Sequence, residues 1–278
     1  ILAALPNAID ALSEDGWTNA AKSILTTDTR PKGASVQLIL AGQSITITGI
    51  AKGAGMIKPN MATMLAYVAT DAEISATRLQ TLVSTAAECS FNRITVDGDT
   101  STNDAAMLVA TGASNLDIDG LSAEEQTRFE LAVIEVFISL AQQVIRDGEG
   151  ATKFVTVRVT GGGDSAECLA VAYTVAESPL VKTALFASDP NWGRILAAIG
   201  RAGITDLNVD AIQVYLDDVL IAEDGGRAAS YTEQLGQSVM SQEDITIEIR
   251  LNRGEARETV WTTDFSHEYV TINAEYRT

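Results

Sequence analysis

The chain has 278 residues, of which 46% are hydrophobic and 20% charged, and this composition suits one large globular domain or two smaller ones. The net charge of -18 argues against nucleic acid as a partner, because phosphate contacts require clusters of Lys and Arg. The longest apolar segment, residues 131–145, contains Glu135 and is shorter than a membrane span, so we expect no membrane partner. No basic segment precedes the opening residues, so we expect no signal peptide and a cytoplasmic protein.

The predicted elements begin with a helix over residues 1–23, where large apolar side chains recur at helical spacing. A loop over residues 26–33 separates this helix from residues 36–50. The latter alternate apolar and polar side chains on both sides of Gly42, which predicts a β-hairpin. A glycine-rich loop follows over residues 52–60.

Beyond this loop the pattern predicts a short strand over residues 64–75 and a helix over residues 75–91. Residues 94–112 predict a strand, a polar turn, and then a buried strand or helix. The clearest helix spans residues 122–148, because it opens with a Ser-x-x-Glu capping box and ends at a glycine.

Residues 154–163 predict a strand and residues 164–178 a capped helix. The rest of the chain alternates short strands with one or two helices, and two of its strand-like segments are residues 245–251 and 269–278. Because predicted strands outnumber helices and pair through hairpins, we expect an α+β fold of layered sheets and helices rather than a doubly wound parallel sheet.

Few residues in this chain suit the common catalytic devices. The one histidine, His267, lies in an alternating segment that predicts a strand, where a lone histidine is usually structural. Residues 97–104 match a calcium loop over three positions before the pattern fails, so we expect a turn there and no metal site. Cys89 and Cys168 lie far apart in apolar surroundings, which predicts two reduced core residues.

A nucleophile in such a chain has to be activated without imidazole or metal, which leaves a lysine base or the α-amine of an N-terminal Thr, Ser or Cys. The stretch GAGMIKPNMATML, residues 53–65, places glycines and Pro59 ahead of Thr63. Cleavage between Ala62 and Thr63 would give Thr63 a free α-amine with a pKa of about 8, able to take the proton of its own hydroxyl. The residues alone favour the other interpretation, in which Thr63 is a cap or the start of a strand.

The same stretch closely resembles the self-cleavage region of the ornithine acetyltransferases, also called glutamate N-acetyltransferases, of arginine biosynthesis. Five further segments resemble successive signatures of that family in the same order: LTTDTRPK (25–32), VDGDTSTND (96–104), RDGEGATKFVTVRV (146–159), SPLVKTALFASDPNWGRILAAIGRAG (178–203) and INAEYRT (272–278). The resemblance therefore runs over the whole chain.

The resemblance implies an α+β fold of the ornithine acetyltransferase type, related to that of N-terminal-nucleophile aminopeptidases. It implies that Thr63 is the catalytic nucleophile and carries the acetyl group. The implied substrate-binding residues are Thr26, Lys52, Thr63, Glu149, Asn273 and Thr278. A Lys ammonium with hydroxyl and amide donors suits the α-carboxylate of an acetylated amino acid, and Glu149 suits an ornithine ammonium. From the residues alone, Lys52 would be a solvated lysine and Glu149 a charge at a helix end.

The implied reaction moves an acetyl group from N-acetylornithine to glutamate without a cofactor, and acetyl-CoA serves some family members as a second donor. Cleavage between Ala62 and Thr63 would divide the chain into residues 1–62, the end of an α chain, and residues 63–278, a β chain. Two of each would form a heterotetramer. In the family a long segment precedes the position of Ile1 and supplies a Thr-Gly pair for the oxyanion hole, so we expect an N-terminally truncated copy.

Two other functions stay open at this stage. One is a related N-terminal-nucleophile aminopeptidase or amidohydrolase, which would release acyl groups to water. The other is a catalytically dead remnant that only binds its ligands. The segment from Asp189 to Arg194 is part of a family signature whose role the residues do not reveal. We expect a turn that packs Trp192 and leave the segment out of the predicted site.

Overall fold

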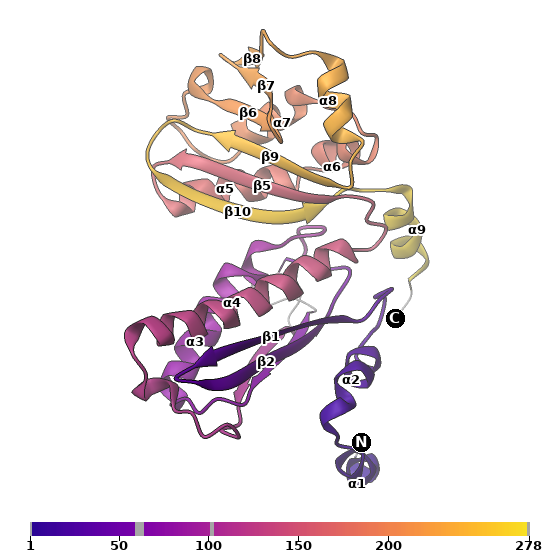
Figure 1. The fold of residues 1–278 in the computed structure, drawn as a ribbon. Helices are drawn as coiled ribbons and strands as arrows, with labels where there is room; N and C mark the ends of the chain where they lie inside the picture. The colour runs from indigo at the N-terminus through magenta and orange to yellow at the C-terminus, as the bar shows by residue number, and fades with distance from the viewer. Residues whose placement is uncertain (1, 59–63, 101–102, 277–278) are drawn as a thin grey trace.

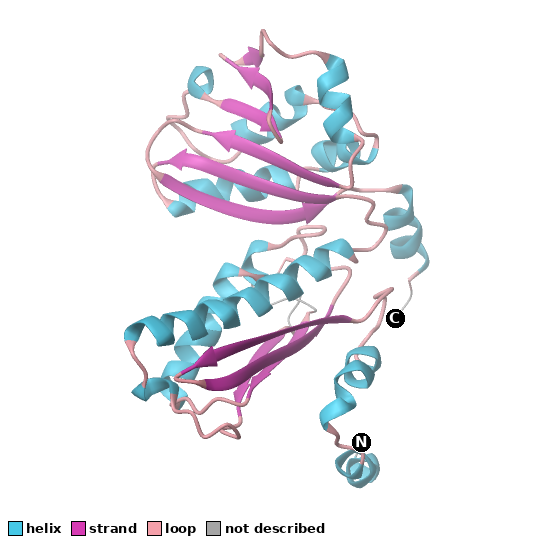
Figure 2. Ribbon diagram, viewed as in Figure 1, coloured by secondary structure: helices cyan, strands magenta, loops and turns pink. Residues whose placement is uncertain are grey.

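The computed structural model describes residues 2–58, 64–100 and 103–276. These residues form two mixed sheets, each covered by helices and each with a hydrophobic core of its own (Figure 1, Figure 2). The predicted α+β fold of layered sheets and helices is therefore confirmed.

Short helical pieces replace the single helix predicted over residues 1–23. They are η1 (Leu2–Ala4), α1 (Leu5–Asp10), η2 (Glu14–Gly16) and α2 (Trp17–Ser23), where η denotes a 3-10 helix. The break lies at Ser13, whose backbone is extended and whose side chain accepts a hydrogen bond from the Asp15 amide to start a new helix. The apolar side chains of α1 are exposed, so no packing against a core holds the pieces in one line.

The first sheet has the strand order β1-β2-β3-β4, with β1 (Lys32–Leu40), β2 (Gln43–Lys52), β3 (Leu65–Thr70) and β4 (Ala105–Ala110). Strands β1 and β2 form the predicted hairpin. Both turn residues, Ala41 and Gly42, have positive φ angles, as a two-residue hairpin turn requires. Strand β3 then pairs antiparallel with β2 and parallel with β4, which brings the end of β2 beside the starts of β3 and β4.

Two long helices cover this sheet: α3 (Ala76–Cys89) and α4 (Ala123–Arg146), accompanied by the short turns η3 (Phe91–Arg93) and η4 (Ile118–Gly120). Helix α4 begins with the predicted capping box, in which the Ser122 and Glu125 side chains each accept a hydrogen bond from the other residue's backbone amide. It buries Phe137 and Leu140 fully and packs on β1 and β2. The first core therefore lies between α4 and this sheet.

The second sheet has the order β10-β5-β9-β6-β7-β8, with β5 (Phe154–Gly162), β6 (Gln213–Leu216), β7 (Val219–Glu223), β8 (Gly226–Arg227), β9 (Asp244–Arg250) and β10 (Ala256–Thr263). Its helical elements are α5 (Ser165–Ala176), α6 (Pro179–Phe186), α7 (Trp192–Gly200), η5 (Val209–Ala211) and α8 (Glu233–Met240). The predicted capped helix is α5, and the Asp164 side chain accepts a hydrogen bond from the Glu167 amide at its start. Alternate valines of β5, Val155, Val157 and Val159, are fully buried in the second core.

The C-terminal segment is helical where a strand was predicted. His267, placed by the alternating pattern in a strand, is the first residue of α9 (His267–Glu275). The side chain of Ser266 caps this helix by accepting from the Tyr269 amide. Val270 and Ile272 alternate with polar neighbours and so imitate a strand, but the cap and not the alternation decides the conformation. The prediction of a strand over residues 269–278 is wrong for residues 269–275, and residues 277 and 278 lie outside the described residues.

The two cysteines differ in their surroundings. Cys168 is buried in the second core as predicted, whereas Cys89 is exposed at the end of α3, where the helix turns its polar face to solvent. The prediction that both are core residues is therefore wrong for Cys89. No helix among the described residues is long and apolar enough to cross a membrane.

Candidate active site

The candidate site lies where β2 ends and where β3 and β4 begin. In the ladder, Lys52 at the end of β2 pairs with Leu65, the first residue of β3, and Leu65 pairs with Ala105, the first residue of β4. The Lys52 side chain is 7% exposed, so it is not the solvated lysine that the residues alone suggested. The Lys52 charge acts on the Asp104 carboxyl, which directly precedes β4, so the lysine lies near this end of the sheet.

Met64 fixes the start of β3 between these two strands. Its amide donates a hydrogen bond to the Asp104 carboxylate, and its carbonyl accepts one from the Ala105 amide at 3.1 Å. Burial raises the pKa of Asp104 to about 6, although the Met64 amide and the Lys52 charge both act to lower it. The predicted nucleophile Thr63 precedes Met64 in the chain, and both Thr63 and Ala62 lie outside the described residues.

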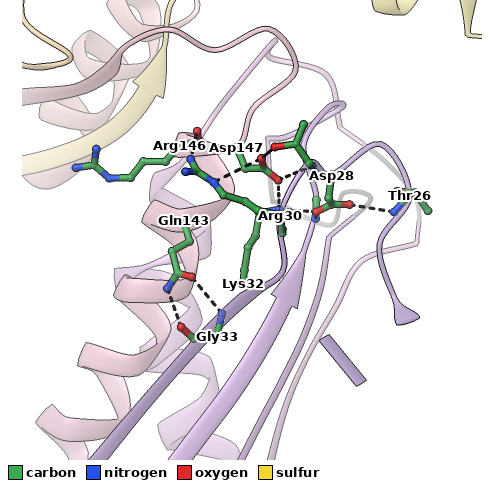
Figure 3. Close-up of polar contacts among 10 residues, drawn as sticks. Thr26, Asp28, Arg30, Lys32, Gly33, Gln143, Arg146 and Asp147 are labelled. Carbon is green, nitrogen blue, oxygen red and sulfur yellow. Dashed lines mark hydrogen bonds and ion pairs between the residues drawn. The ribbon is translucent and has the colours of Figure 1, made fainter. Parts of the chain in front are cut away.

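Asp28 ties the loop that contains Thr26 to the end of β2, as Figure 3 shows for the Thr26 amide. Its carboxylate accepts hydrogen bonds from the Thr26 amide at 3.1 Å and from the Gly53 amide at 2.6 Å. Burial would raise the pKa of Asp28, but the hydrogen bonds from Gly53, Lys32 and Thr26 outweigh it and hold the pKa below its ordinary value. Asp28 is therefore an anion that positions Thr26 beside the residue that follows Lys52.

A buried ion triad connects this loop to the end of α4 (Figure 3). The Lys32 ammonium lies 2.5 Å from a carboxylate oxygen of Asp28 and 2.5 Å from one of Asp147, and all three side chains are at most 2% exposed. Asp147 also accepts hydrogen bonds from the amide and the hydroxyl of Thr29. Because every charge is paired and hydrogen-bonded, the triad fixes the loop rather than binding a ligand.

Glu149 and Asn273 meet beside Ala54, two residues beyond the end of β2. The Glu149 amide donates to the carbonyl of Ala54 at 2.8 Å, and the Asn273 side-chain amide donates to the Glu149 carboxylate at 2.8 Å. Asn273 comes from α9, so the helix that the sequence pattern missed supplies this contact. Directly after the end of β2, Asp28 therefore contacts the chain at Gly53 and Glu149 contacts it at Ala54.

Gly55 leaves room for the Glu149 carboxylate, because a methyl group at this glycine would collide with it. We expect Gly55→Ala to displace Glu149 and to raise KM for N-acetylornithine, the substrate that the resemblance implies, by about tenfold, the loss of roughly one charge-assisted hydrogen bond. Steady-state kinetics would measure the change. Gly16→Ala, at a position with open space around it, is the control and should leave KM unchanged. An unaltered KM in Gly55→Ala would remove Glu149 from substrate binding.

The loop ahead of the predicted cut is anchored by residues from beyond the cut. Asp97 accepts hydrogen bonds from the amides of Met56 and Ile57 at 2.7 and 3.1 Å, and the Lys58 ammonium lies 2.9 Å from the Glu177 carboxylate. Burial raises the pKa of Asp97 despite these hydrogen bonds. The Asp97 side chain also accepts from the Asp99 amide at 3.2 Å, and residues 101 and 102 of the predicted turn lie outside the described residues.

The structure brings together four of the residues predicted for the site, Thr26, Lys52, Glu149 and Asn273. The cleavage-site residues Ala62 and Thr63 and the predicted ligand Thr278 lie outside the described residues. Sequence reasoning missed Asp28 and Asp104, although both lie within segments that resemble family signatures. In the part of the chain that the structure describes, no group of three or more His, Cys, Asp or Glu could hold a metal ion.

The segment from Asp189 to Arg194 leads into α7 and supplies its N-cap. The Asn191 side chain caps α7 by accepting from the Arg194 amide, and its own amide donates to Asp189. Trp192 begins α7 and packs against the second core. The contacts of the segment are those of a helix start, and the segment is not part of the candidate site.

Comparison with known proteins identifies relatives of the chain. The profile of the ArgJ family matches residues 1–278. The arginine biosynthesis bifunctional protein ArgJ of Pseudomonas fluorescens (strain Pf0-1) is 62% identical over 276 residues, which are 99% of this chain and 68% of that protein. The protein of the same name from Psychrobacter arcticus is 58% identical over 280 residues and is covered to 68% of its length. The crystal structure of ArgJ from Bacillus halodurans matches with a TM-score of 0.68 and 36% sequence identity, over 74% of this chain and 96% of that one.

Proposed function

The chain belongs to the ArgJ family, and on that premise we propose that it transfers an acetyl group from N-acetylornithine to glutamate. The products are ornithine and N-acetylglutamate. The observation that carries the proposal is the meeting of Thr26, Lys52, Glu149 and Asn273 around the end of β2, beside the start of the strand that follows Thr63. The similar proteins are named bifunctional, which supports a second reaction in which acetyl-CoA is the acetyl donor.

The proposed reaction is a double displacement at Thr63. The Thr63 hydroxyl attacks the acetyl carbonyl of N-acetylornithine while its α-amine takes the hydroxyl proton. The tetrahedral intermediate collapses, its C–N bond breaks, and the proton passes to the leaving amine of ornithine. The amine of glutamate then attacks the acetyl ester of Thr63, which restores the hydroxyl and releases N-acetylglutamate.

The surrounding residues would bind the two amino acids in turn. Lys52 and the Thr26 hydroxyl would hold the α-carboxylate, and Glu149 would hold an ammonium of ornithine. Asn273 supports this arrangement because it already donates to the Glu149 carboxylate, and we place Thr278 with it as a further ligand. Both substrates carry an α-carboxylate, so one Lys52 can serve both half-reactions.

We further propose that the chain cuts itself between Ala62 and Thr63, giving residues 1–62 and residues 63–278 as α-chain and β-chain segments. The ladder between β2 and β3, which pairs residues 47–52 with residues 65–70, supports lasting association of the two pieces. Two such pairs would form a heterotetramer. We place the protein in the cytoplasm, where its amino-acid substrates are made.

An acceptor experiment tests the proposed function. The protein is incubated with N-acetylornithine alone, with glutamate added, or with acetyl-CoA and glutamate, and the products are followed by mass spectrometry. We expect N-acetylglutamate only when glutamate is present, with an equal amount of ornithine released from N-acetylornithine or of coenzyme A released from acetyl-CoA. Release of free acetate at the same rate with and without glutamate would show a hydrolase instead.

A further inference from the structure

A second hollow lies away from the end of β2, between the end of α3 and the strands β5 and β10. Its volume is about 560 Å³, within the range of small-molecule sites, and we call it the arginine pocket. The residues that line it are Cys89, Arg93, Arg158, Thr160, Arg257, Glu258, Thr259 and Trp261. The proposed acetyl transfer uses none of these side chains.

The strand register explains how four of these side chains converge. In the β5–β10 ladder, Arg257 pairs with Thr160 and Thr259 pairs with Arg158. Side chains of paired residues share a face of the sheet, as do residues two apart on one strand. Two guanidinium groups and two hydroxyl groups therefore alternate over one face at the sheet edge that β10 forms.

The three arginines of the pocket and the three carboxylates around it are unevenly paired. Arg93 is paired on both sides, with Glu88 at 2.7 Å and with Glu258 at 3.2 Å. Arg158 has a single, longer pair at 3.6 Å with Glu248. The Arg257 side chain makes no hydrogen bond or ion pair with any residue that the structure describes, although its backbone belongs to the β5–β10 ladder. The chain has 37 acidic residues and only 19 Lys and Arg, so an arginine left without a carboxylate is notable here.

We propose that the arginine pocket binds a phosphorylated small molecule through Arg93, Arg158 and Arg257. A guanidinium presents a planar fork of N–H donors that matches phosphate oxygens in pairs. Three guanidinium groups from separate elements offer more donors than the two oxygens of a carboxylate can accept, which favours a phosphate over a carboxylate. The hydroxyl groups of Thr160 and Thr259 add further hydrogen-bond donors. Trp261 adds an aromatic wall on which a nucleotide base can stack.

Two backbone hydrogen bonds connect the wall of the pocket to the loop ahead of the predicted cut. The carbonyl of Trp261 accepts a hydrogen bond from the Thr95 amide at 3.0 Å, and the next amide, that of Val96, donates to the carbonyl of Ile57 at 2.7 Å. One peptide unit thus separates the pocket wall from the loop ahead of the predicted cut. The phosphates of acetyl-CoA are therefore one source of the ligand, which rests on the proposed function, and a free polyphosphate is the other.

Cys89 provides a direct test because it is an exposed thiol in the wall of the pocket, whereas Cys168, the other cysteine, is buried. Alkylation of Cys89 by iodoacetamide is followed by peptide mass spectrometry in the intact protein, with inorganic pyrophosphate or acetyl-CoA at millimolar concentration. We expect both to slow alkylation several-fold relative to sodium chloride of equal ionic strength. Arg257→Gln should raise the half-protecting concentration about tenfold, as expected for one lost charge-assisted hydrogen bond.

Arg227→Gln is the matched control, because Arg227 is also an exposed arginine on an edge strand but lies at the opposite edge of the sheet. It should leave the protection unchanged. Protection by acetyl-CoA at lower concentration than by pyrophosphate assigns the pocket to the coenzyme, and the reverse order assigns it to a free polyphosphate. No protection beyond that of chloride, or equal protection in Arg257→Gln, would overturn the proposal. The assay reads a thiol and not acetyl transfer, so its outcome does not depend on whether Thr63 is the nucleophile.

Discussion

Replacing Thr63 with Ala is expected to leave the chain uncut and to lower acetyl transfer by more than about 10³-fold, as loss of the nucleophile does in other covalent mechanisms. The reason is chemical, because no other hydroxyl can carry the acetyl group and also provide its own α-amine as base. Thr63→Ser keeps the hydroxyl and the capacity for an α-amine, so it should retain part of both activities. Intact mass after expression reports cleavage, and formation of N-acetylglutamate reports transfer.

Thr77→Ala is the control for this experiment, because Thr77 is an exposed residue of α3 away from the candidate site. It should be cut and should transfer acetyl groups at the rate of the unaltered protein. A Thr63→Ala chain that still cuts itself would exclude Thr63 from the cleavage step. An uncut chain that transfers acetyl groups at full rate would exclude the α-amine as base.

Local signals sufficed for the elements whose sequence patterns agree with their caps and turns. The β1–β2 hairpin followed from alternation on both sides of Gly42, and α4 from its capping box and terminal glycine, and both form as predicted. The C-terminal helix α9 was not predicted. Its alternating apolar residues suggested a strand, whereas the side chain of Ser266 caps a helix. Alternation in a short segment is weak evidence when none of its residues is buried.

The residues of the candidate site also show how far prediction from the sequence reaches for single side chains. The family resemblance selected Lys52 and Glu149, and the structure places both at the end of β2. The resemblance did not select Asp28 or Asp104, because their roles depend on which backbone amides their carboxylates accept hydrogen bonds from. Asp28 accepts from Gly53, which is 25 residues away in the chain, and Asp104 accepts from Met64, which is 40 residues away. Contacts of this kind are fixed by strand order, which sequence periodicity does not reveal.

Lys182→Met is expected to stabilise the protein most at acidic to neutral pH and progressively less as the pH rises. Lys182 lies in α6 and is fully buried, and its ammonium donates to the Thr262 hydroxyl at 3.0 Å and to the Thr263 carbonyl. Burial lowers its pKa to about 7, although Asp264, Asp97 and Glu177 all act to raise it. None of these carboxylates forms an ion pair with it among the described residues, so the charged form is poorly compensated.

The sign of the pH dependence follows from proton binding. Between pH of about 7 and 10, Lys182 in the folded protein has lost its proton, while an unfolded lysine, with a pKa of about 10.4, keeps it. The unfolded state then binds more protons, so the free energy of unfolding that Lys182 contributes rises with pH by up to about 1.4 kcal/mol per pH unit. Below pH of about 7 both states are protonated, and the cost of burying the charge is fully present.

Urea unfolding at pH 6, 7, 8 and 9 measures this difference directly. The free energy of unfolding of Lys182→Met minus that of the unaltered protein should be largest at pH 6 and should shrink at each higher pH. Removal of the lysine also leaves the Thr263 carbonyl without its donor, which lowers the free energy of unfolding of the variant by about 1–3 kcal/mol. Because this loss is the same at every pH, it does not change how the difference depends on pH. Lys22→Met, at an exposed lysine of α2, should show no such slope. A difference that stays constant from pH 6 to pH 9 would mean that Lys182 keeps its proton throughout, held by Asp264 and its neighbours.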